Sequence, residues 1–367
     1  LRFTGILIVL MLGSRSALRA ARLGFCRKSL LGGFNQRSIY IASSLSGAHD
    51  EFLRNTAKVD SPERLSTLLE LVSMNGETIV DPKKRDGLNP FLVPVSKGVD
   101  SSLLCYIRWP TQRVDMPLQL VRTTEAGVKL VALSTDHFCH RLSVEMDFCN
   151  NDRTNKAIEL LNSQGELYKQ GDHLPFLNSG KFPASTEDEI RLVMDRFILM
   201  KVGTFSDCYE RLASNFRTQG NEVSALITSE RSVNVFYSWG HPMHFHSKML
   251  KELGRDKECI ESARASMGVP KWTLGDSKAD LEEAIKMAGF TNPSLVGDMH
   301  LFRSTDPREK DIAEGHNPIQ IILDQAAHLM DAVALGSFKG GWDAARPELA
   351  RRYRDGGYPE MAEFIES

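Results

Sequence analysis

Three imidazole side chains crowd into the segment His241-Pro242-Met243-His244-Phe245-His246. Imidazole nitrogens are common ligands of zinc and other transition metals. Two features argue against a metal site in this segment. No Cys, Asp or Glu lies nearby at a ligand spacing, and a helix that begins after Pro242 would place His244 and His246 on different faces. We therefore expect no metal ligand and no cofactor here.

A second group, His137, Cys139 and His140, follows Asp136. It contains the residue types of a cysteine nucleophile and its base, but such a pair must meet in space. Close neighbours on one helix seldom point at each other. We expect Asp136 to cap the helix that follows it and His140 to be partly buried, and we expect no catalytic residue in this group.

Glycines and tryptophans supply the remaining candidates. The segment Gly336–Gly341 lacks the Lys-Ser or Lys-Thr pair of a phosphate-binding loop, so we expect a turn between helices. Arg108-Trp109-Pro110 offers the residue types of interface hot spots, although a Trp at a strand end also closes a sheet over its core. Trp272 and Trp342 allow the same two interpretations, and we favour packing between helices. The sequence names no partner-binding residue.

The elements that position these residues change in type along the chain. The polar stretch 47–60 is expected to be a flexible start, and Ser61-Pro62-Glu63 then has the residues of a helix start. Apolar residues follow at helical spacing, namely Leu65, Leu68, Leu69 and Val72. From about Pro82 onward short β-prone runs appear, separated by turn residues. They are Phe91–Val95, Leu103–Trp109, Leu118–Thr123 and Val128–Leu133. We expect a small antiparallel sheet over residues 85–135.

Helical patterns fill the chain after Asp136. A capping box at Thr186–Glu189 and the pair Asn317-Pro318 predict helix starts. Gly220 and Gly254 lie 34 residues apart, which is the period of the tetratricopeptide repeat. Each glycine is followed by a small residue five positions later, as is Gly203, and small residues allow paired helices to approach closely. These features predict a tetratricopeptide-like helical array, with an irregular helical domain as the alternative.

Charge and cysteine content exclude several classes of protein. The first 49 residues contain seven basic residues and no acidic one. Removing those seven from the 45 basic residues leaves 38 against 47 acidic residues, a net charge of −9. A body this acidic repels phosphate backbones, so we expect no nucleic-acid partner. Five cysteines are scattered without a C-x-x-C pair between Cys105 and Cys259, which disfavours disulfides and a zinc ribbon.

Residues 1–46 have the composition of a targeting presequence. An apolar core, Gly5–Gly13, precedes an Arg- and Ser-rich tract without acids, as in a signal peptide followed by a transit peptide. Plastids acquired by secondary endosymbiosis use such a two-part address, and a mitochondrial presequence is the alternative. No later stretch is long and apolar enough to cross a membrane as a helix, so we expect the mature protein not to span one.

Four segments together resemble a family of chloroplast proteins of plants and algae. They are Arg85–Pro90, Ile107–Thr111, Ala263–Gly275 and Gly341–Asp343, and the resemblance runs from about residue 60 to the C-terminus. It implies a non-enzymatic stromal factor that assists assembly of the chloroplast ATP synthase by binding an unassembled subunit. It implies no catalytic residues. The chain departs from the plant pattern around the histidines at 241–246.

We therefore predict an α+β protein in which a small antiparallel sheet domain precedes a tetratricopeptide-like helical array. The expected division is a presequence over 1–46, an α+β domain over 60–150 and a helical domain over 151–367. The predicted function is protein binding in the plastid stroma, with the mitochondrial matrix as the alternative location. The alternative function is an enzyme with a histidine-containing site between sheet and helices, using His137, His140 or the histidines of 241–246.

Overall fold

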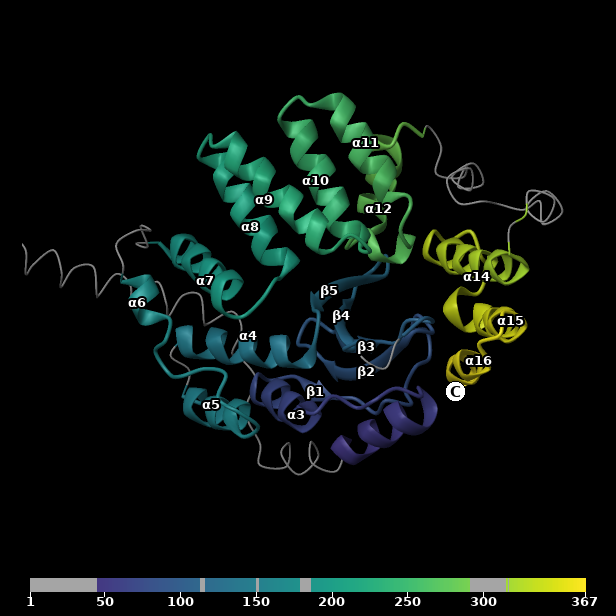
Figure 1. Ribbon diagram of the computed structural model, residues 1–367, viewed down its shortest axis with the longest axis horizontal. Helices are drawn as coiled ribbons and strands as arrows, with labels where there is room; N and C mark the ends of the chain where they lie inside the picture. The colour runs from purple at the N-terminus through teal and green to yellow at the C-terminus, as the bar shows by residue number, and fades with distance from the viewer. Residues whose placement is uncertain (1–44, 113–115, 150–151, 179–185, 291–314, 316) are drawn as a thin grey trace, which may run out of the picture.

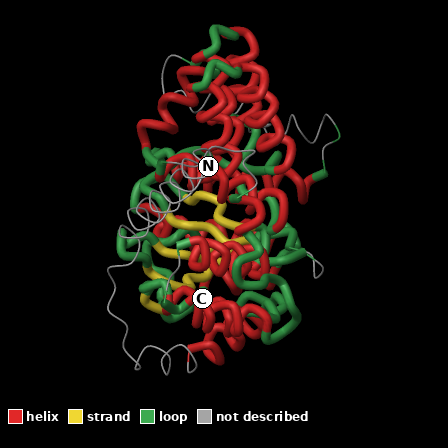
Figure 2. The backbone as a smooth tube through the Cα atoms, turned by 90° about the vertical axis from the view of Figure 1, so that its left-hand side faces the viewer, coloured by secondary structure: helices red, strands yellow, loops and turns green. Residues whose placement is uncertain are grey.

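The computed structural model of the protein describes residues 45–112, 116–149, 152–178, 186–290, 315 and 317–367. A central β-sheet is flanked by helices, and a row of helical hairpins extends away from it (Figure 1). Seen from the side, the strands lie in the middle of the molecule with helices above and below (Figure 2). The predicted α+β class is confirmed. The predicted presequence lies outside the described residues, except for its last two positions.

The chain is helical from residue 45 to residue 56 and ends this helix in a π-helical turn, η1 (Phe52–Thr56). The expectation of a flexible start over residues 47–60 is therefore wrong. Phe52 and Leu53 are buried, and the ring of Phe52 packs edge-on against Phe364, with 6.4 Å between the ring centroids. Two apolar side chains that dock on a distant helix are enough to order a polar segment.

Five antiparallel strands form one sheet in the order β1-β2-β3-β4-β5. They are β1 (Thr78–Ile79), β2 (Leu92–Lys97), β3 (Leu103–Ile107), β4 (Gln119–Thr123) and β5 (Val128–Ala132). The sheet predicted over residues 85–135 is confirmed, and the four predicted runs match β2 to β5. The sequence does not predict β1, because two residues are too few to show a period.

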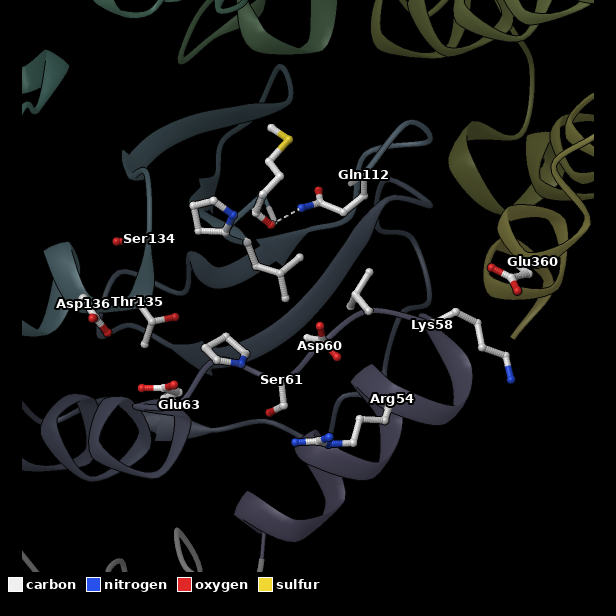
Figure 3. Close-up of a pocket in the computed structure, with 15 residues that line it drawn as sticks. Arg54, Lys58, Asp60, Ser61, Glu63, Gln112, Ser134, Thr135, Asp136 and Glu360 are labelled. Atoms are coloured by element: carbon white, nitrogen blue, oxygen red, sulfur yellow. Dashed lines mark hydrogen bonds between the residues drawn. The ribbon is translucent and has the colours of Figure 1, made fainter. Parts of the chain in front are cut away.

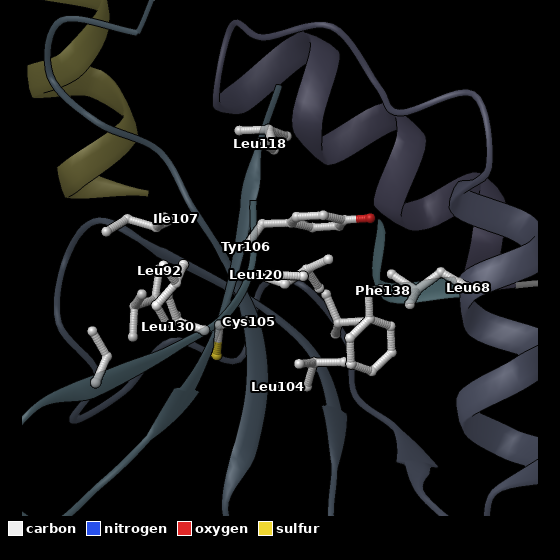
Figure 4. Close-up of a cluster of buried hydrophobic side chains, with 14 of the residues drawn as sticks. Leu68, Leu92, Leu104, Cys105, Tyr106, Ile107, Leu118, Leu120, Leu130 and Phe138 are labelled. Carbon is white, nitrogen blue, oxygen red and sulfur yellow. The ribbon is translucent and has the colours of Figure 1, made fainter. Parts of the chain in front are cut away.

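Both faces of the sheet are covered, which explains why its strands show little alternation of polar and apolar residues. Tyr106 on β3 points to the side where Phe138 and Leu68 lie, whereas Ile107 points to the opposite side (Figure 4). Five successive residues of β2, from 92 to 96, are all buried. Strands buried on both faces carry nearly continuous apolar runs.

One side of the sheet is covered by α3 (Leu65–Met74) and α4 (Thr135–Phe148), and α5 (Thr154–Asn162) and α6 (Leu174–Leu177) lie beyond them. The apolar face predicted for the first of these helices is buried in α3. The predicted start at Ser61 is wrong, because α3 begins after Arg64, whose guanidinium donates to the Leu161 carbonyl at 2.6 Å.

The predicted cap of α4 is also wrong. Ser134 is the N-cap, and its hydroxyl accepts a hydrogen bond from the backbone N–H of His137 at 3.2 Å. Asp136 lies in the first turn, where its carboxylate pairs with Arg64 at 3.4 Å. Asp136 still suits this place, because a negative charge near a helix N-terminus is stabilised by the helix dipole.

Helical hairpins follow the sheet. The elements are α7 (Glu187–Lys201), α8 (Ser206–Thr218), α9 (Glu222–Val235), α10 (Gly240–Glu252), α11 (Asp256–Ser266), η2 (Lys271–Thr273) and α12 (Lys278–Met287). The capping box of Thr186 and Glu189 begins α7 as predicted. The α8–α9 and α10–α11 hairpins turn at Gly220 and Gly254, both in the left-handed conformation that favours glycine (φ 73° and 71°). The predicted helix pairs are confirmed at these two turns.

Three C-terminal helices pack against the side of the sheet opposite α3 and α4. They are α14 (Pro318–Ala334), α15 (Gly341–Asp355) and α16 (Pro359–Glu366). Asn317 caps α14 and the segment Gly336–Gly341 turns from α14 into α15, both as predicted. Buried Arg85 holds the last helix by donating to the Phe364 carbonyl at 2.6 Å. None of the helices in the described residues is long and apolar enough to cross a membrane.

Candidate functional site

The three histidines of 241–246 lie on α10 and diverge. The helix begins at Gly240, three residues before the start expected after Pro242. The Nε2 atom of His241 lies 3.2 Å from Glu210 Oε2, and the Nδ1 atom of His246 lies 2.9 Å from Ser229 Oγ. His244 points elsewhere, toward Glu283 on α12 at 3.8 Å. The three imidazoles therefore point in different directions, and His244 and His246 diverge as the helical spacing predicted.

The His244 ring differs from its two neighbours in having no hydrogen bond. The side chain is 2% exposed, and neither ring nitrogen has a hydrogen-bond partner among the described residues. Burial lowers the pKa of His244 to about 4, and the nearby ammonium of Lys248 adds to this effect. A buried polar group without a partner costs about 1–3 kcal/mol of stability.

The His137, Cys139 and His140 group on α4 has no geometry for catalysis. Cys139 is fully buried, and burial raises the pKa of its thiol well above the ordinary value. A thiol that stays protonated is a poor nucleophile. The His137 ring packs edge-on against Phe205, with centroids 6.4 Å apart, and the half-buried His140 ring packs on Tyr168. The structure does not bring either histidine together with those of α10.

A charged cleft lies where the sheet meets the helical hairpins. Two adjoining hollows of about 530 and 410 Å³ share Lys129 on β5 with Asp207 and Arg211 on α8. Charged side chains from β4, α4, α7 and α8, and from the residue before β1, complete the lining of this junction cleft. They include Glu77, Arg122, Arg141, Glu145, Asp188, Arg191 and Glu210.

Ion pairs satisfy the charges at the centre of the junction cleft. Arg141 on α4 binds Asp207 through two hydrogen bonds of 2.8 and 2.6 Å. Arg211 binds Asp195 on α7 through two of 2.7 and 2.6 Å, and also reaches Asp207 at 2.9 Å. The two guanidinium groups hold the pKa of the Asp207 carboxyl well below its usual range, against the effect of burial. Bidentate ion pairs of this kind fix the relative orientation of the groups that they join. These contacts therefore hold α4, α7 and α8 in place relative to one another.

Only part of the junction cleft is signalled in the sequence. The pairs Asp207–Arg211 and Arg141–Glu145 have the i,i+4 spacing of helix-surface ion pairs. The contact between Arg141 and Asp207 joins positions 66 residues apart, and no local pattern indicates it.

Apart from the junction cleft, a wide polar groove of about 900 Å³ lies beside the start of α3. Its lining carries charges of both signs, among them Arg54, Asp60, Glu63, Asp136 and Glu360, and these side chains surround an open space (Figure 3). Small-molecule sites are mostly apolar with a few converging polar groups. This groove is instead lined mainly by polar and charged residues.

Aromatic side chains lock the sheet to both helical regions. The Trp109 ring lies 5.8 Å from Trp239 and 5.3 Å from Trp272, measured between centroids. Phe91 joins Trp272 to Tyr353 at 6.1 and 6.0 Å. Trp109 and Trp272 therefore pack between the sheet and the helices, as one of the two interpretations predicted. Trp342 is partly buried and packs against the same core. Arg108 is also buried and donates to the Ala57 carbonyl at 3.1 Å.

Exposed apolar side chains gather on the outer face of α9. Val223 and Ile227 are 68% and 59% exposed, and their i,i+4 spacing places them side by side. Tyr237, just beyond the end of the helix, is 73% exposed. We call the pair Val223 and Ile227 the α9 patch. Large exposed apolar side chains that cluster on one element are typical of interaction surfaces.

Comparison with known families covers most of the chain. Residues 47–179 match the PAB N-terminal family, residues 206–291 the PAB middle domain and residues 299–367 the PAB C-terminal domain. The chain belongs to the PAB family.

A relative from Arabidopsis thaliana is similar to the chain over nearly its whole length. The chain is 31% identical over 325 residues to the Arabidopsis thaliana "Protein IN CHLOROPLAST ATPASE BIOGENESIS, chloroplastic". The aligned region covers 88% of this chain and 92% of the relative. This confirms the resemblance to a chloroplast protein family, and with it the predicted plastid location. No solved structure matches the chain.

Each pair of the three PAB regions is joined by a buried cation. Arg141 of the N-terminal region binds Asp207 of the middle region. In the middle region, the backbone N–H of Lys271 donates to Asp331 of the C-terminal region at 2.8 Å, and the ammonium lies 3.5 Å from the same carboxylate. Arg85 of the N-terminal region holds α16 of the C-terminal region. The regions therefore form one packed body.

Proposed function

We propose that this protein is a non-enzymatic assembly factor of the plastid stroma that binds an unassembled subunit of the chloroplast ATP synthase. The relative is named for chloroplast ATPase biogenesis, and the chain covers 92% of its length. Similarity over nearly the whole relative supports transfer of the role, rather than of one domain alone.

The observation that carries the binding part of the proposal is the α9 patch. Val223 and Ile227 stand on a helix whose opposite side, at Ala225 and Ser229, is buried against its neighbours. The outer face has no packing role within the described residues, yet it carries large apolar side chains. An unassembled subunit exposes apolar surface that its own complex later covers, and such surface is matched by an apolar patch on a rigid helix.

A binding experiment with the purified subunits of the chloroplast ATP synthase tests the proposal. Each subunit is titrated separately into the full chain, and binding is measured by calorimetry. We expect one subunit to bind, and the Val223→Asp/Ile227→Asp double variant to bind it at least tenfold more weakly, which corresponds to about 1.4 kcal/mol.

The matched control is Val99→Asp, which changes an 82% exposed valine on the β2–β3 turn. It should bind the subunit as the wild type does. The proposal is refuted if no subunit binds the wild type, or if the double variant and the control bind equally well.

A further inference from the structure

Ligand-forming side chains of α10 and α12 face each other at a position where the sequence shows no motif. His244 on α10 and Asp280 and Glu283 on α12 each offer one ligand atom, and these three atoms lie within 4.8 Å of one another. The expectation of no metal ligand at residues 241–246 considered only residues that are close to them in the sequence. The fold supplies the two carboxylates from a helix about 40 residues further along the chain.

The His244 imidazole supplies an independent indication of a ligand. It is nearly completely buried, and both of its nitrogens lack a hydrogen bond among the described residues. His241 and His246, on the same helix, each have one nitrogen within hydrogen-bond distance of a side-chain oxygen. Buried polar atoms are rarely left without a partner. Since His244 Nε2 points at Glu283, the missing partner belongs between the ring and the carboxylates.

We propose that His244, Asp280 and Glu283 bind a divalent transition-metal ion of the zinc type. One imidazole nitrogen and two carboxylate oxygens are ligands that zinc accepts, and three protein ligands leave a fourth position for water. Metal–ligand bonds of about 2.1 Å place tetrahedral ligand atoms about 3.4 Å apart. The Glu283 side chain is partly exposed and can close this distance. Asp280 is held by two hydrogen bonds from Ser277 to its Oδ2 atom, at 2.7 and 3.0 Å, so it would bind the ion through Oδ1, and the imidazole is held by its surroundings. The ion would tie α10 to α12.

The Lys248 ammonium would compete with the ion for the two carboxylates. Its ammonium lies 2.8 Å from Glu283 and 3.2 Å from Asp280, so a positive charge already stands beside both carboxylates. The Lys248 side chain is 35% exposed and can turn outward. A metal ion must displace it, which predicts that removing the ammonium tightens metal binding.

The test is a zinc titration of the full chain by calorimetry, with bound zinc measured after dialysis. We expect the wild type to bind one zinc ion per chain. Lys248→Met should bind zinc about tenfold more tightly, and His244→Gln at least tenfold more weakly. Glu283→Gln, at a surface position that folding tolerates, should also bind at least tenfold more weakly.

His246→Gln is the matched control, because His246 lies on the same helix and is hydrogen-bonded to Ser229 instead. It should bind zinc as the wild type does. The proposal is overturned if neither the wild type nor Lys248→Met binds zinc. It is also overturned if Glu283→Gln binds zinc as tightly as the wild type does. Neither result depends on whether the chain binds a subunit of the ATP synthase, so this site and the α9 patch are tested separately.

Discussion

Replacing Ala263 with Leu tests whether the helical array is packed as closely as its small residues indicate. Ala263 lies on α11 and is completely buried. It belongs to a core cluster with residues of α10 and α12, including Leu250, Leu281 and Ala284. A leucine adds three carbon atoms at a point where these helices already meet. The surrounding side chains must leave their preferred rotamers, or the helices must separate.

The expected loss follows from this burial. Extra methylene groups forced into a filled core cost about 1–3 kcal/mol. In a domain of this size each kcal/mol lowers the melting temperature by roughly 2–4 °C. The matched control is Ala265→Leu, two residues further along the same helix, where the side chain is exposed. It should change stability by no more than about 0.5 kcal/mol. Arg264 is a poorer control, because its Nε donates to the Ala288 carbonyl at 3.0 Å.

Urea melts of the wild type and both variants, followed by circular dichroism, measure the difference. We expect Ala263→Leu to shift the midpoint to lower urea, with Ala265→Leu close to the wild type. Equal losses in the two variants would mean that α11 is not packed at Ala263, and the close-packed hairpin would then be wrong.

Two further predictions concern the junction and the response to pH. A Cβ atom on Gly127 would lie 2.0 Å from the Trp272 carbonyl oxygen. Gly127→Ala should therefore separate the β4–β5 turn from η2 and lower the melting temperature. The control Gly47→Ala, which has open space around it, should not lower the melting temperature. Burial lowers the pKa of several histidines below 6.5, so the unfolded chain binds protons that the folded chain does not, and stability should fall as the pH drops below about 6.5. Each pKa unit corresponds to about 1.4 kcal/mol, and urea melts at pH 7.5, 6 and 5 measure the loss; a flat profile would contradict it. These histidines are His49, His137, His140, His244 and His246.

Local patterns in the sequence predicted most elements of the fold, because their signals lie within a few residues. The runs that became β2 to β5, the capping box at Thr186 and the turn glycines Gly220 and Gly254 are of this kind. Failures occurred where a distant contact decides the structure. The helix that ends at Thr56 is held by docking on α16, and β1 exists only because β2 pairs with it.

The candidate sites were less predictable for the same reason. The sequence correctly separated His244 and His246, since helical spacing alone sets their directions on α10. It could not place Glu283 opposite His244 or Asp207 opposite Arg141, because these pairs depend on how helices pack. Exposure of Val223 and Ile227 is also a tertiary property, as the same residues would be buried if another helix covered α9.

The cluster of aromatic rings between the sheet and the helices also provides an intrinsic fluorescence probe. Trp109, Trp239 and Trp272 are three of the four tryptophans in the chain, and their rings lie close enough to share excitation. Their emission therefore reports mainly on the place where the sheet meets the middle helices, with Tyr353 of α15 close by through Phe91. A partner that pulls these parts away from one another would let water reach the indoles and shift the emission to longer wavelengths. A partner that docks on the outer face of α9 would leave the emission unchanged, so an unlabelled sample can distinguish opening of the body from binding to its surface.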